Sequence, residues 1–552
     1  MQQAKKTFMY GAVILSVAGA ITKILGACFR IPLANWIGAE GMAYYNGAYP
    51  IYQLLLTIGT AGIPVAISRM VSERIAADNE GAANRVFKVS MVVMIIVGIV
   101  LSGALLLGAD TFSSHIKKLN GSYYAMMAIA PALFFVPIMG TFRGYFQGMQ
   151  NMKPTAVSQI VEQLFRVICG LALAHILLNA MGREYAAAGA TFGATAGALF
   201  GLVTMIILYT KFKASKSYRE KREEARKSRE HKESARKIIK QLLYIAVPIT
   251  IGVAIMPVMS MIDLLIVTDR LSASGFDAHS VRSLYGQLTG FAGPLINMPK
   301  VLTQAIAVSM VPTVVRAFKA RDHDFLHYNV SLGMRFAMII GLPCSVGIGV
   351  LSEPIMLLLY PNQPVDAVGA ASCMTILAVG IVFLASIDTL SAVLQGVGKQ
   401  MIPVVNIAIG ALVKVVLTWT LTGIPIVNVK GAAIGTVSAY IVATILNYRA
   451  VKTYTGTKFD AKKTFLRPLI AVSVMGLVAR GLYWIVTPLI GSVLATILSI
   501  CAAGVIYVVM LFVTRSIKGE ELKLLPKGEM LYGFYRRLLL TMPRKNGKMN
   551  RS

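Results

Sequence analysis

The sequence predicts an all-α polytopic membrane protein with about fourteen transmembrane helices. Its 552 residues are 56% hydrophobic and only 14% charged, whereas soluble chains carry about 25% charged residues. Many windows of about twenty residues are almost free of charge, which is the length of a membrane-spanning helix. No window alternates apolar and polar residues in the manner of a membrane β-barrel, so helices are the expected spanning elements.

The apolar stretches indicate where each span begins and ends. The first follows a basic start, but its apolar run continues past Lys23 and Arg30 with no convincing cleavage site. It therefore favours a retained helix over a signal peptide. The expected spans are 9–36, 45–68, 89–109, 122–142, 154–179, 185–210, 241–268, 284–315, 329–352, 367–395, 401–422, 431–448, 468–488 and 490–514.

The formal net charge of +30 is distributed unevenly along the chain. With the N-terminus inside, 41 of the 54 Lys and Arg residues fall in the expected cytoplasmic segments and six in the external loops. This asymmetry follows the positive-inside rule, so we expect both termini in the cytoplasm. The basic excess then faces anionic lipid head groups, and a nucleic-acid partner is not expected.

A charged segment divides the chain. Residues 211–240 hold thirteen basic and five acidic residues and no apolar face, which is typical of a solvated cytoplasmic linker. It separates an N-terminal lobe at 1–210 from a C-terminal lobe at 241–452, each with six spans. A terminal helix pair at 453–514 and a basic cytoplasmic tail at 515–552 follow, and the tail either lies on the membrane or is solvated.

The two lobes look like copies of each other. A Gln-Gly pair stands nineteen residues before Arg166 in the first lobe and nineteen residues before Lys414 in the second. Each series then leads to a helix of small residues, GATFGATAG at 189–197 and GAAIGTVSA at 431–439. Six spans per lobe give both lobes the same orientation, so the sequence predicts a parallel pseudo-repeat and a transporter with two rocking lobes.

Ionisable residues inside spans are costly and by default indicate a cavity or a substrate path. On the first span, Lys23 and Arg30 are seven residues apart and share one helix face. We expect both to line a cavity, and the alternative is that each side chain reaches a different membrane interface.

The fifth span carries a polar stripe within about 100° of arc. Its members are Thr155, Gln159, Glu162, Gln163 and Arg166. Such a stripe belongs in a protein interior, and the i, i+4 spacing allows Glu162 to pair with Arg166. The alternative to a binding site is a structural ion pair with no ligand.

Four further ionisable residues lie in or beside the spans of the second lobe. Lys414 has no acidic residue near it in the sequence, and a buried unpaired ammonium needs an anion, which favours an anion site. Asp263 and Asp388 either pair with basic groups or titrate as proton-coupling carboxylates. Lys300, which follows two prolines, either faces the cavity or caps a broken helix.

The sequence favours no enzyme class. It has no P-loop, its six histidines are dispersed, and its five cysteines show no metal-ligand spacing. We therefore expect no catalytic residue, cofactor or metal. The membrane potential or an ion gradient would supply the energy, and the sequence does not choose between them.

Three segments carry a family resemblance: 22–55, 247–275 and RGYFQGMQNMKPTAVSQIVEQ at 143–163. They resemble the polysaccharide-transporter branch of the multidrug/oligosaccharidyl-lipid/polysaccharide (MOP) exporter superfamily. Within it, the chain is similar to stage V sporulation protein B and YtgP-type proteins of Gram-positive bacteria and to MurJ-type lipid II flippases. The resemblance covers essentially the whole chain.

The resemblance implies two six-helix lobes around a cationic central cavity. It implies movement of an undecaprenyl-diphosphate-linked sugar, lipid II or a related polysaccharide unit, across the cytoplasmic membrane by alternating access, for cell-envelope biosynthesis. The basic pair of the MurJ pattern falls on Lys23 and on or beside Arg30. An expected second-span arginine is absent, and the eighth-span arginine position is Gln287. Arg166 and Lys414 are hypothesised to supply the missing charge.

Two other functions remain open. A cation-coupled multidrug antiporter of the same superfamily would favour acidic and aromatic groups for organic cations, whereas the charges inside these spans are mainly basic. A non-transporting scaffold for envelope assembly would bind envelope-synthesis proteins and would not need a cationic cavity.

Overall fold

The computed structural model describes residues 2–77, 79–115, 119–215 and 233–516, and every regular element within these ranges is helical. Twelve segments of the described chain are long and apolar enough to cross a membrane. The first of them, Val17–Ala76, has 60 residues, which is longer than one crossing needs. The all-α polytopic fold is thus confirmed, while the count of fourteen and the cytoplasmic termini stay predictions. Most of the expected linker (216–232) and tail (517–552) lie outside the described residues.

The chain forms two compact units. Unit 1 comprises 1–298, 359–377 and 404–443, and unit 2 comprises 299–358, 378–403 and 444–552. Unit 1 therefore contains helices from both expected lobes, and the lobes themselves stay a prediction from the sequence repeat.

The elements of unit 1 are α1 (Gln2–Thr60), α2 (Ile63–Ala76), α3 (Glu80–His115), α4 (Ser122–Ile129), α5 (Ala132–Gly148), α6 (Lys153–Met181), α7 (Arg183–Ala214), α9 (Ala235–Ala273), α10 (Ala278–Gly286), the π-helix η1 (Gln287–Ala292), α11 (Gly293–Asn297), the start of α15 (Pro364–Gly396), most of α16 (Met401–Thr422) and the first half of α17 (Lys430–Thr455). Those of unit 2 are α12 (Lys300–Lys319), α13 (His323–Val350), α14 (Ser352–Leu359), the remainders of α15 and α17, the π-helix η2 (Lys462–Leu466), α18 (Arg467–Ile490) and α19 (Ser492–Val513).

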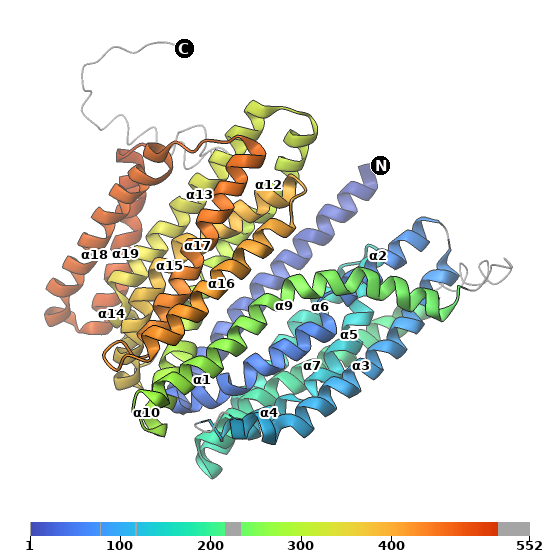
Figure 1. Ribbon diagram of the computed structural model, residues 1–552, viewed down its shortest axis with the longest axis horizontal. Helices are drawn as coiled ribbons and strands as arrows, with labels where there is room; N and C mark the ends of the chain where they lie inside the picture. Colours follow the sequence, from blue (N-terminus) through green and yellow to red (C-terminus); the bar gives the residue numbers. More distant parts are fainter. Residues whose placement is uncertain (1, 78, 116–118, 216–232, 517–552) are drawn as a thin grey trace. The chain divides into compact units, whose positions relative to one another are not determined.

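In unit 1, α6 packs along α7 and against α1, and α5 packs against α2, α3 and α7 (Figure 1). An aromatic cluster fills the core between α3, α5 and α7. The ring of Phe87 lies 5.3 Å from that of Phe142, 4.8 Å from that of Tyr145 and 4.9 Å from that of Tyr209. Such contacts contribute beyond their buried area, so they hold these helices in fixed positions relative to one another.

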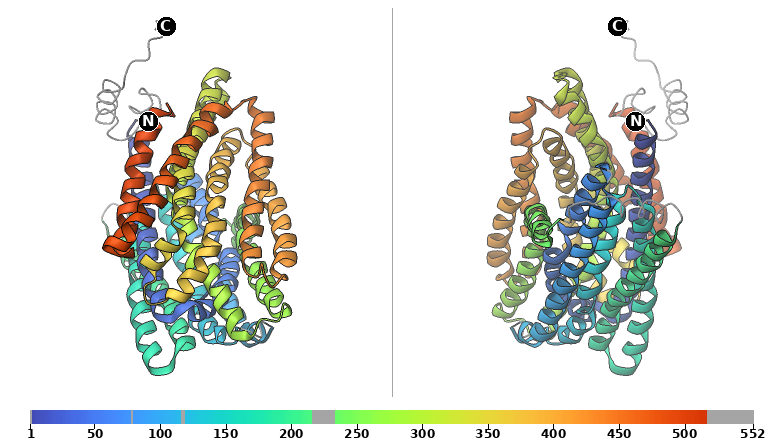
Figure 2. Two further views of the ribbon diagram at one scale, coloured as in Figure 1. Left: turned by 90° about the vertical axis from the view of Figure 1, so that its left-hand side faces the viewer. Right: turned by 90° about the vertical axis from the view of Figure 1, so that its right-hand side faces the viewer.

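In unit 2, α18 and α19 form the expected terminal helix pair. They lie side by side, drawn in red in Figure 2, and α18 packs against α13. The chain reverses between them at Gly491, whose φ of 81° suits glycine. The Tyr507 hydroxyl of α19 donates to the Ile339 carbonyl oxygen of α13 at 2.7 Å, which fixes the pair on the unit.

The connection expected between the first two spans is not a loop. Residues 2–60 form two helical halves that meet at a sharp kink at Gly38, where φ is 67° and ψ is −175°. The Ala39 N–H just after the break donates to Asp366 Oδ2 at 2.9 Å, and Glu40 accepts from Arg282 Nε at 2.7 Å. Two carboxylates therefore serve the N-terminal end of the second helical half, where N–H groups are otherwise unpaired and the helix dipole favours negative charge.

The expected span 284–315 is also different, because α10, η1, α11 and α12 divide it. Glycines and prolines interrupt regular α-helix here, and the backbone of Gly286 touches the Ala39 carbonyl so closely that no Cβ fits. Gln287 turns inward at the start of η1 and donates to Asp366 Oδ1 and Ser283 Oγ, each at 3.1 Å. The π-helical turn and the break before Pro299 therefore replace one straight span.

Matching contacts support the internal repeat. α5 and α15 both end at a glycine, and in each case the next helix begins five residues later. A Cβ at Gly193 of α7 would lie 2.5 Å from the Arg166 carbonyl oxygen, and one at Gly435 of α17 would lie 3.1 Å from that of Lys414. In both copies, a glycine thus lets the small-residue helix approach the helix that carries the basic residue.

Replacing Gly38 by alanine tests the break in α1. A side chain is strained at this φ and ψ, so we expect Gly38→Ala to lower the free energy of unfolding by about 1–3 kcal/mol. Thermal unfolding of the purified protein in detergent measures the change. Gly252→Ala is the matched control, because Gly252 lies within α9 and its Cβ would meet nothing within 4 Å; an equal midpoint for both variants would contradict the prediction.

Candidate functional site

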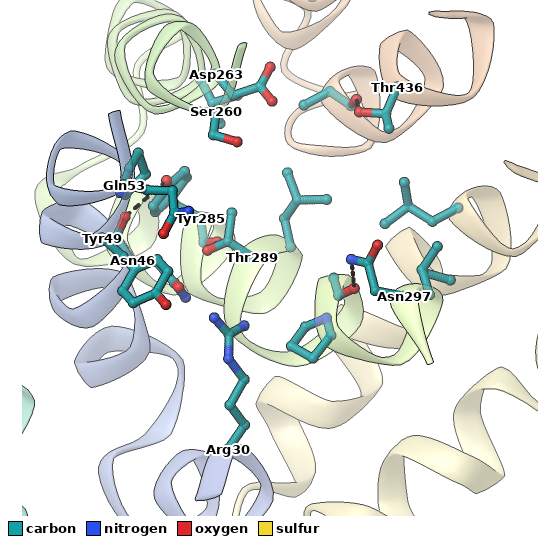
Figure 3. Close-up of a pocket in the computed structure, with 18 of the residues that line it drawn as sticks. Arg30, Asn46, Tyr49, Gln53, Ser260, Asp263, Tyr285, Thr289, Asn297 and Thr436 are labelled. Atoms are coloured by element: carbon teal, nitrogen blue, oxygen red, sulfur yellow. Dashed lines mark hydrogen bonds between the residues drawn. The ribbon is translucent and has the colours of Figure 1, made fainter. Parts of the chain in front are cut away.

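Unit 1 contains a polar cavity of ≈ 360 Å³. Its walls come from α1, α9, α17, one residue of α15, and the interrupted segment α10–η1–α11 (Figure 3). The break in α1 and the π-helical turn η1 thus place side chains from distant parts of the chain around one space. The lining residues are Arg30, Asn46, Tyr49, Pro50, Gln53, Ser260, Asp263, Val267, Tyr285, Leu288, Thr289, Gly293, Pro294, Ile296, Asn297, Leu377, Ala432, Thr436 and Tyr440.

The lining holds one basic and one acidic side chain, Arg30 and Asp263. The other polar groups are neutral amides and hydroxyls: Asn46, Gln53 and Asn297, and Tyr49, Ser260, Tyr285, Thr289, Thr436 and Tyr440. In Figure 3 the Arg30 side chain enters from one side, while Asp263 and Ser260 lie on the opposite side. The cavity is therefore polarised along the direction from arginine to aspartate.

Arg30 lies on the first half of α1 and is half-buried. Its guanidinium carbon is 5.8 Å from the centre of the Tyr45 ring, which holds the cation by its π face. Across the described residues, no ion pair is found for Arg30. Apart from its contact with Tyr45, its fixed fork of N–H donors can therefore serve a ligand in the cavity.

Asp263 of α9 forms an ion pair with Lys414 Nζ of α16. Lys414 has no acidic residue near it in the sequence, and its partner stands 151 residues earlier in the chain. Of the two alternatives stated for Asp263, the structure has the pairing with a basic group. The position four residues before Lys414 is Gly410, whereas the position four residues before Arg166 is Glu162. The acid that serves Lys414 therefore comes from another helix, which spacing along one helix does not reveal.

The polar stripe of α6 contains the expected pair and one further arginine. Glu162 accepts from Arg166 Nη2 at 3.2 Å and from Arg143 Nη2 at 2.9 Å. Arg143, which falls between the expected spans 122–142 and 154–179, lies on α5, where its Nε also donates to Ser158 Oγ at 3.0 Å. Two arginines thus share one carboxylate, which leaves this cluster with a net positive charge.

Arg166 connects this cluster to the cavity. Its Nε is buried and has no hydrogen-bond partner among the described residues. It lies near Tyr45, Tyr49 and Tyr52 of α1, and Tyr49 lines the cavity. Arg166 is therefore one residue layer away from the cavity.

The other residues expected at the site lie elsewhere. Lys23 is exposed on α1 and does not line the cavity. Gln159 is half-buried on α6, and the side chain of Gln287 donates a hydrogen bond to Asp366. Lys300 and Asp388 belong to unit 2, where Asp388 Oδ2 accepts from Thr303 at 3.3 Å. Their membership of one binding site stays a prediction.

Sequence reasoning missed the neutral groups of the cavity. Asn46, Tyr49 and Gln53 follow the i, i+3, i+7 spacing of one helix face and could have been recognised as a polar stripe within an apolar span. Ser260 lies three residues before Asp263 and gives the same signal on α9. Tyr285, Thr289 and Asn297 could not be recognised from such spacing, because their positions depend on the irregular helix η1.

Two family models match the chain. The model described as "Polysaccharide biosynthesis protein" matches residues 8–318, and the model described as "MatE" matches residues 248–420. The first covers more than half of the sequence, and together they extend through most of the predicted spans of both lobes.

Curated relatives match over nearly their whole length. "Lipid II flippase MurJ" of Bacillus subtilis is 30% identical over 548 residues, covering 96% of this chain and 98% of that protein. "Stage V sporulation protein B" of the same organism is 28% identical over 525 residues, covering 95% of this chain and 98% of that protein.

Solved structures show the same fold. A structure titled "Lipid II flippase MurJ, inward closed conformation" has a TM-score of 0.68 at 14% identity and covers 91% of this chain and 98% of its own. An inward-facing MATE family transporter has a TM-score of 0.61 at 15% identity, covering 81% and 98%. The chain therefore belongs to the polysaccharide biosynthesis protein family of the MOP exporter superfamily and is a multi-pass flippase or transporter of the cytoplasmic membrane.

Proposed function

We propose that this protein moves an undecaprenyl-diphosphate-linked sugar precursor, lipid II or a related polysaccharide unit, from the inner to the outer leaflet by alternating access. The observation that carries the proposal is the cavity of unit 1. It offers one arginine without an ion pair among the described residues, within a lining of amides and hydroxyls. That combination matches a head group with negative phosphates and hydroxyl-rich sugars.

Arg30 is the proposed anchor for the diphosphate. A guanidinium forms paired, charge-assisted hydrogen bonds with phosphate oxygens, and these bonds strengthen where water is scarce. The amides and hydroxyls of the lining both donate and accept, as sugar hydroxyls do. A cavity of ≈ 360 Å³ is the size of a small-molecule site, so it would hold part of the head group while the prenyl tail stays in lipid.

The remaining cations have supporting roles in this proposal. Arg166 adds positive potential from behind Tyr49, because Glu162 balances only one of the two arginines that bind it. Lys23, on the same face of α1 as Arg30, would attract the anionic head group before it reaches the cavity. Lys414 acts through Asp263, to which it is bound. The membrane potential, worth about 2.3 kcal/mol per charge per 100 mV, or an ion gradient would supply the energy.

A cation-coupled multidrug antiporter is the second candidate, because the MatE model matches residues 248–420 and MATE transporters share the fold. Such a pump needs an acidic group that is free to bind a cation. Asp263 is the one carboxylate among the lining residues, and the ammonium of Lys414 already holds it. An organic cation would have to displace that ammonium, so the cavity favours an anionic substrate.

Reconstitution in vesicles tests the proposed function directly. The purified protein is incorporated into liposomes with a fluorescent undecaprenyl-diphosphate sugar, under an imposed membrane potential or ion gradient, and movement between leaflets is followed by quenching. We expect movement that depends on the protein and on the diphosphate. Transport of organic cations with no lipid movement under any gradient would instead support the antiporter.

Arg30 variants test the proposed anchor. We expect Arg30→Gln to reduce flipping by about 10- to 100-fold, because charge-assisted bonds to the phosphate are lost. Arg30→Lys should keep part of the activity, since an ammonium provides charge without the paired geometry. The matched control is Arg69→Gln on α2, whose side chain is 66% exposed; equal losses in the Arg30 and Arg69 variants would count against the anchor.

Arg166 and Arg143 form an internal comparison, because both bind the Glu162 carboxylate. Replacing either by glutamine leaves Glu162 with one arginine, so both variants should unfold at lower temperature. Arg166 lies near Tyr49 of the cavity lining, so we expect Arg166→Gln to reduce flipping about tenfold. Arg143→Gln should preserve flipping per folded molecule, and equal flipping by the two variants would argue for a purely structural cluster.

A further inference from the structure

We propose that Asp263 is the sugar-recognition residue of the cavity, where its ionised carboxylate accepts hydrogen bonds from the hydroxyl or amide groups of the sugar. Lys414 is the positioning residue that keeps this carboxylate charged and in place. The inference rests on the proposed function and deepens it, because it fixes which end of the cavity receives the sugar and which receives the diphosphate.

The first step is the layered arrangement of the ion pair. Asp263 lines the cavity, whereas Lys414 does not. The ammonium of Lys414 contacts the Asp263 carboxylate from the neighbouring helix α16, outside the cavity lining. A ligand therefore meets the oxygens of Asp263 and not the ammonium of Lys414.

The second step is the protonation state of Asp263. A carboxyl group in a membrane interior would favour its neutral form, because burial destabilises the charge. The ammonium of Lys414 opposes that effect, since an adjacent opposite charge favours the ionised carboxylate. An ionised carboxylate only accepts hydrogen bonds, so it selects ligand groups that donate, such as sugar hydroxyls and amides.

The third step is the orientation of the ligand. A phosphate near Asp263 would meet a like charge in a poorly hydrated space, which is unfavourable. Arg30 lies on the opposite side of the cavity (Figure 3). The diphosphate therefore belongs beside Arg30 and the neutral sugar beside Asp263.

The surroundings of Asp263 fit this assignment. Ser260 lies one helical turn before it on α9, and Thr436 of α17 lies on the same side of the cavity (Figure 3). Their hydroxyls donate to the carbonyl oxygens of Met256 and Ala432 within their own helices, so their oxygens can accept from a ligand, and neither carries a charge. Together with Asp263 they form a subsite for a hydroxyl-rich, uncharged group.

The test compares two ligands, undecaprenyl diphosphate and the same lipid carrying its sugar, binding to full-length protein in nanodiscs. For Asp263→Asn we expect about tenfold weaker binding of the sugar-bearing lipid, because a charge-assisted acceptor is lost. Binding of the sugar-free lipid should stay equal or tighten, since a negative charge has left the cavity. Arg30→Gln should weaken both ligands.

Lys414 variants separate positioning from direct contact. Lys414→Met leaves Asp263 without its counter-charge, so we expect weaker binding of both lipids, with Lys414→Arg restoring them. Thr436→Val alters the same subsite without touching the ion pair. It should weaken only the sugar-bearing lipid, and it keeps the test decisive if Asp263→Asn does not fold.

Equal weakening of both lipids by Asp263→Asn would show a structural pair and overturn the subsite. Equal tightening of both lipids by Asp263→Asn would also overturn it, since the carboxylate would then only repel the anion. Failure of the unaltered protein to bind either lipid would reject the proposed function itself. These outcomes are distinguishable because each gives a different pattern across the two lipids.

Discussion

An ionised side chain inside a membrane costs about 2.5–3.5 kcal/mol at the centre of a helix unless an opposite charge or water compensates it. The polar interior of unit 1 satisfies this requirement for its acids. Glu162 and Asp263 bind basic side chains, and Glu40 binds Arg282 and Arg183. The basic residues outnumber these partners. Arg30 is the basic residue that lines the cavity without an ion pair among the described residues.

These pairs also join helices of unit 1, including α1, α9 and α10, which line the cavity. Glu162 connects α5 to α6, Asp263 connects α9 to α16, and Glu40 connects the break of α1 to α7 and α10. Because breaking a buried pair leaves an uncompensated charge and costs about 3–5 kcal/mol, each pair restricts the helices it joins. The space between α1, α9 and η1 therefore depends on contacts that lie outside the cavity lining. A cavity built in this way presents its polar groups in defined positions.

The sequence was sufficient for features that depend on local periodicity. The all-helical fold, the terminal helix pair and the stripe of α6 with its Glu162–Arg166 pair all follow from spacing along one helix. Features that depend on tertiary contacts could not be predicted from spacing along the sequence. The partner of Lys414 stands 151 residues away, Arg143 joins Glu162 from a neighbouring helix, and the Gly38 break is completed by Asp366. The neutral lining residues of α1 and α9 could have been predicted from the regular spacing of polar residues on these helices, whereas those of η1 could not.

The two segments of the predicted internal repeat neutralise their basic residues differently. Both copies place a basic residue, Arg166 or Lys414, on a helix that a glycine of the next helix approaches closely. In the first copy the neutralising acid is on the same helix, one turn away, so the charges remain within the α5–α6 cluster. In the second copy that position is Gly410, and the acid is Asp263 on α9, which faces the cavity. The cavity thus has a cation, Arg30, on one side and a paired carboxylate, Asp263, on the other. A ligand with an anionic end and a hydroxyl-rich end has one favourable orientation in such a site.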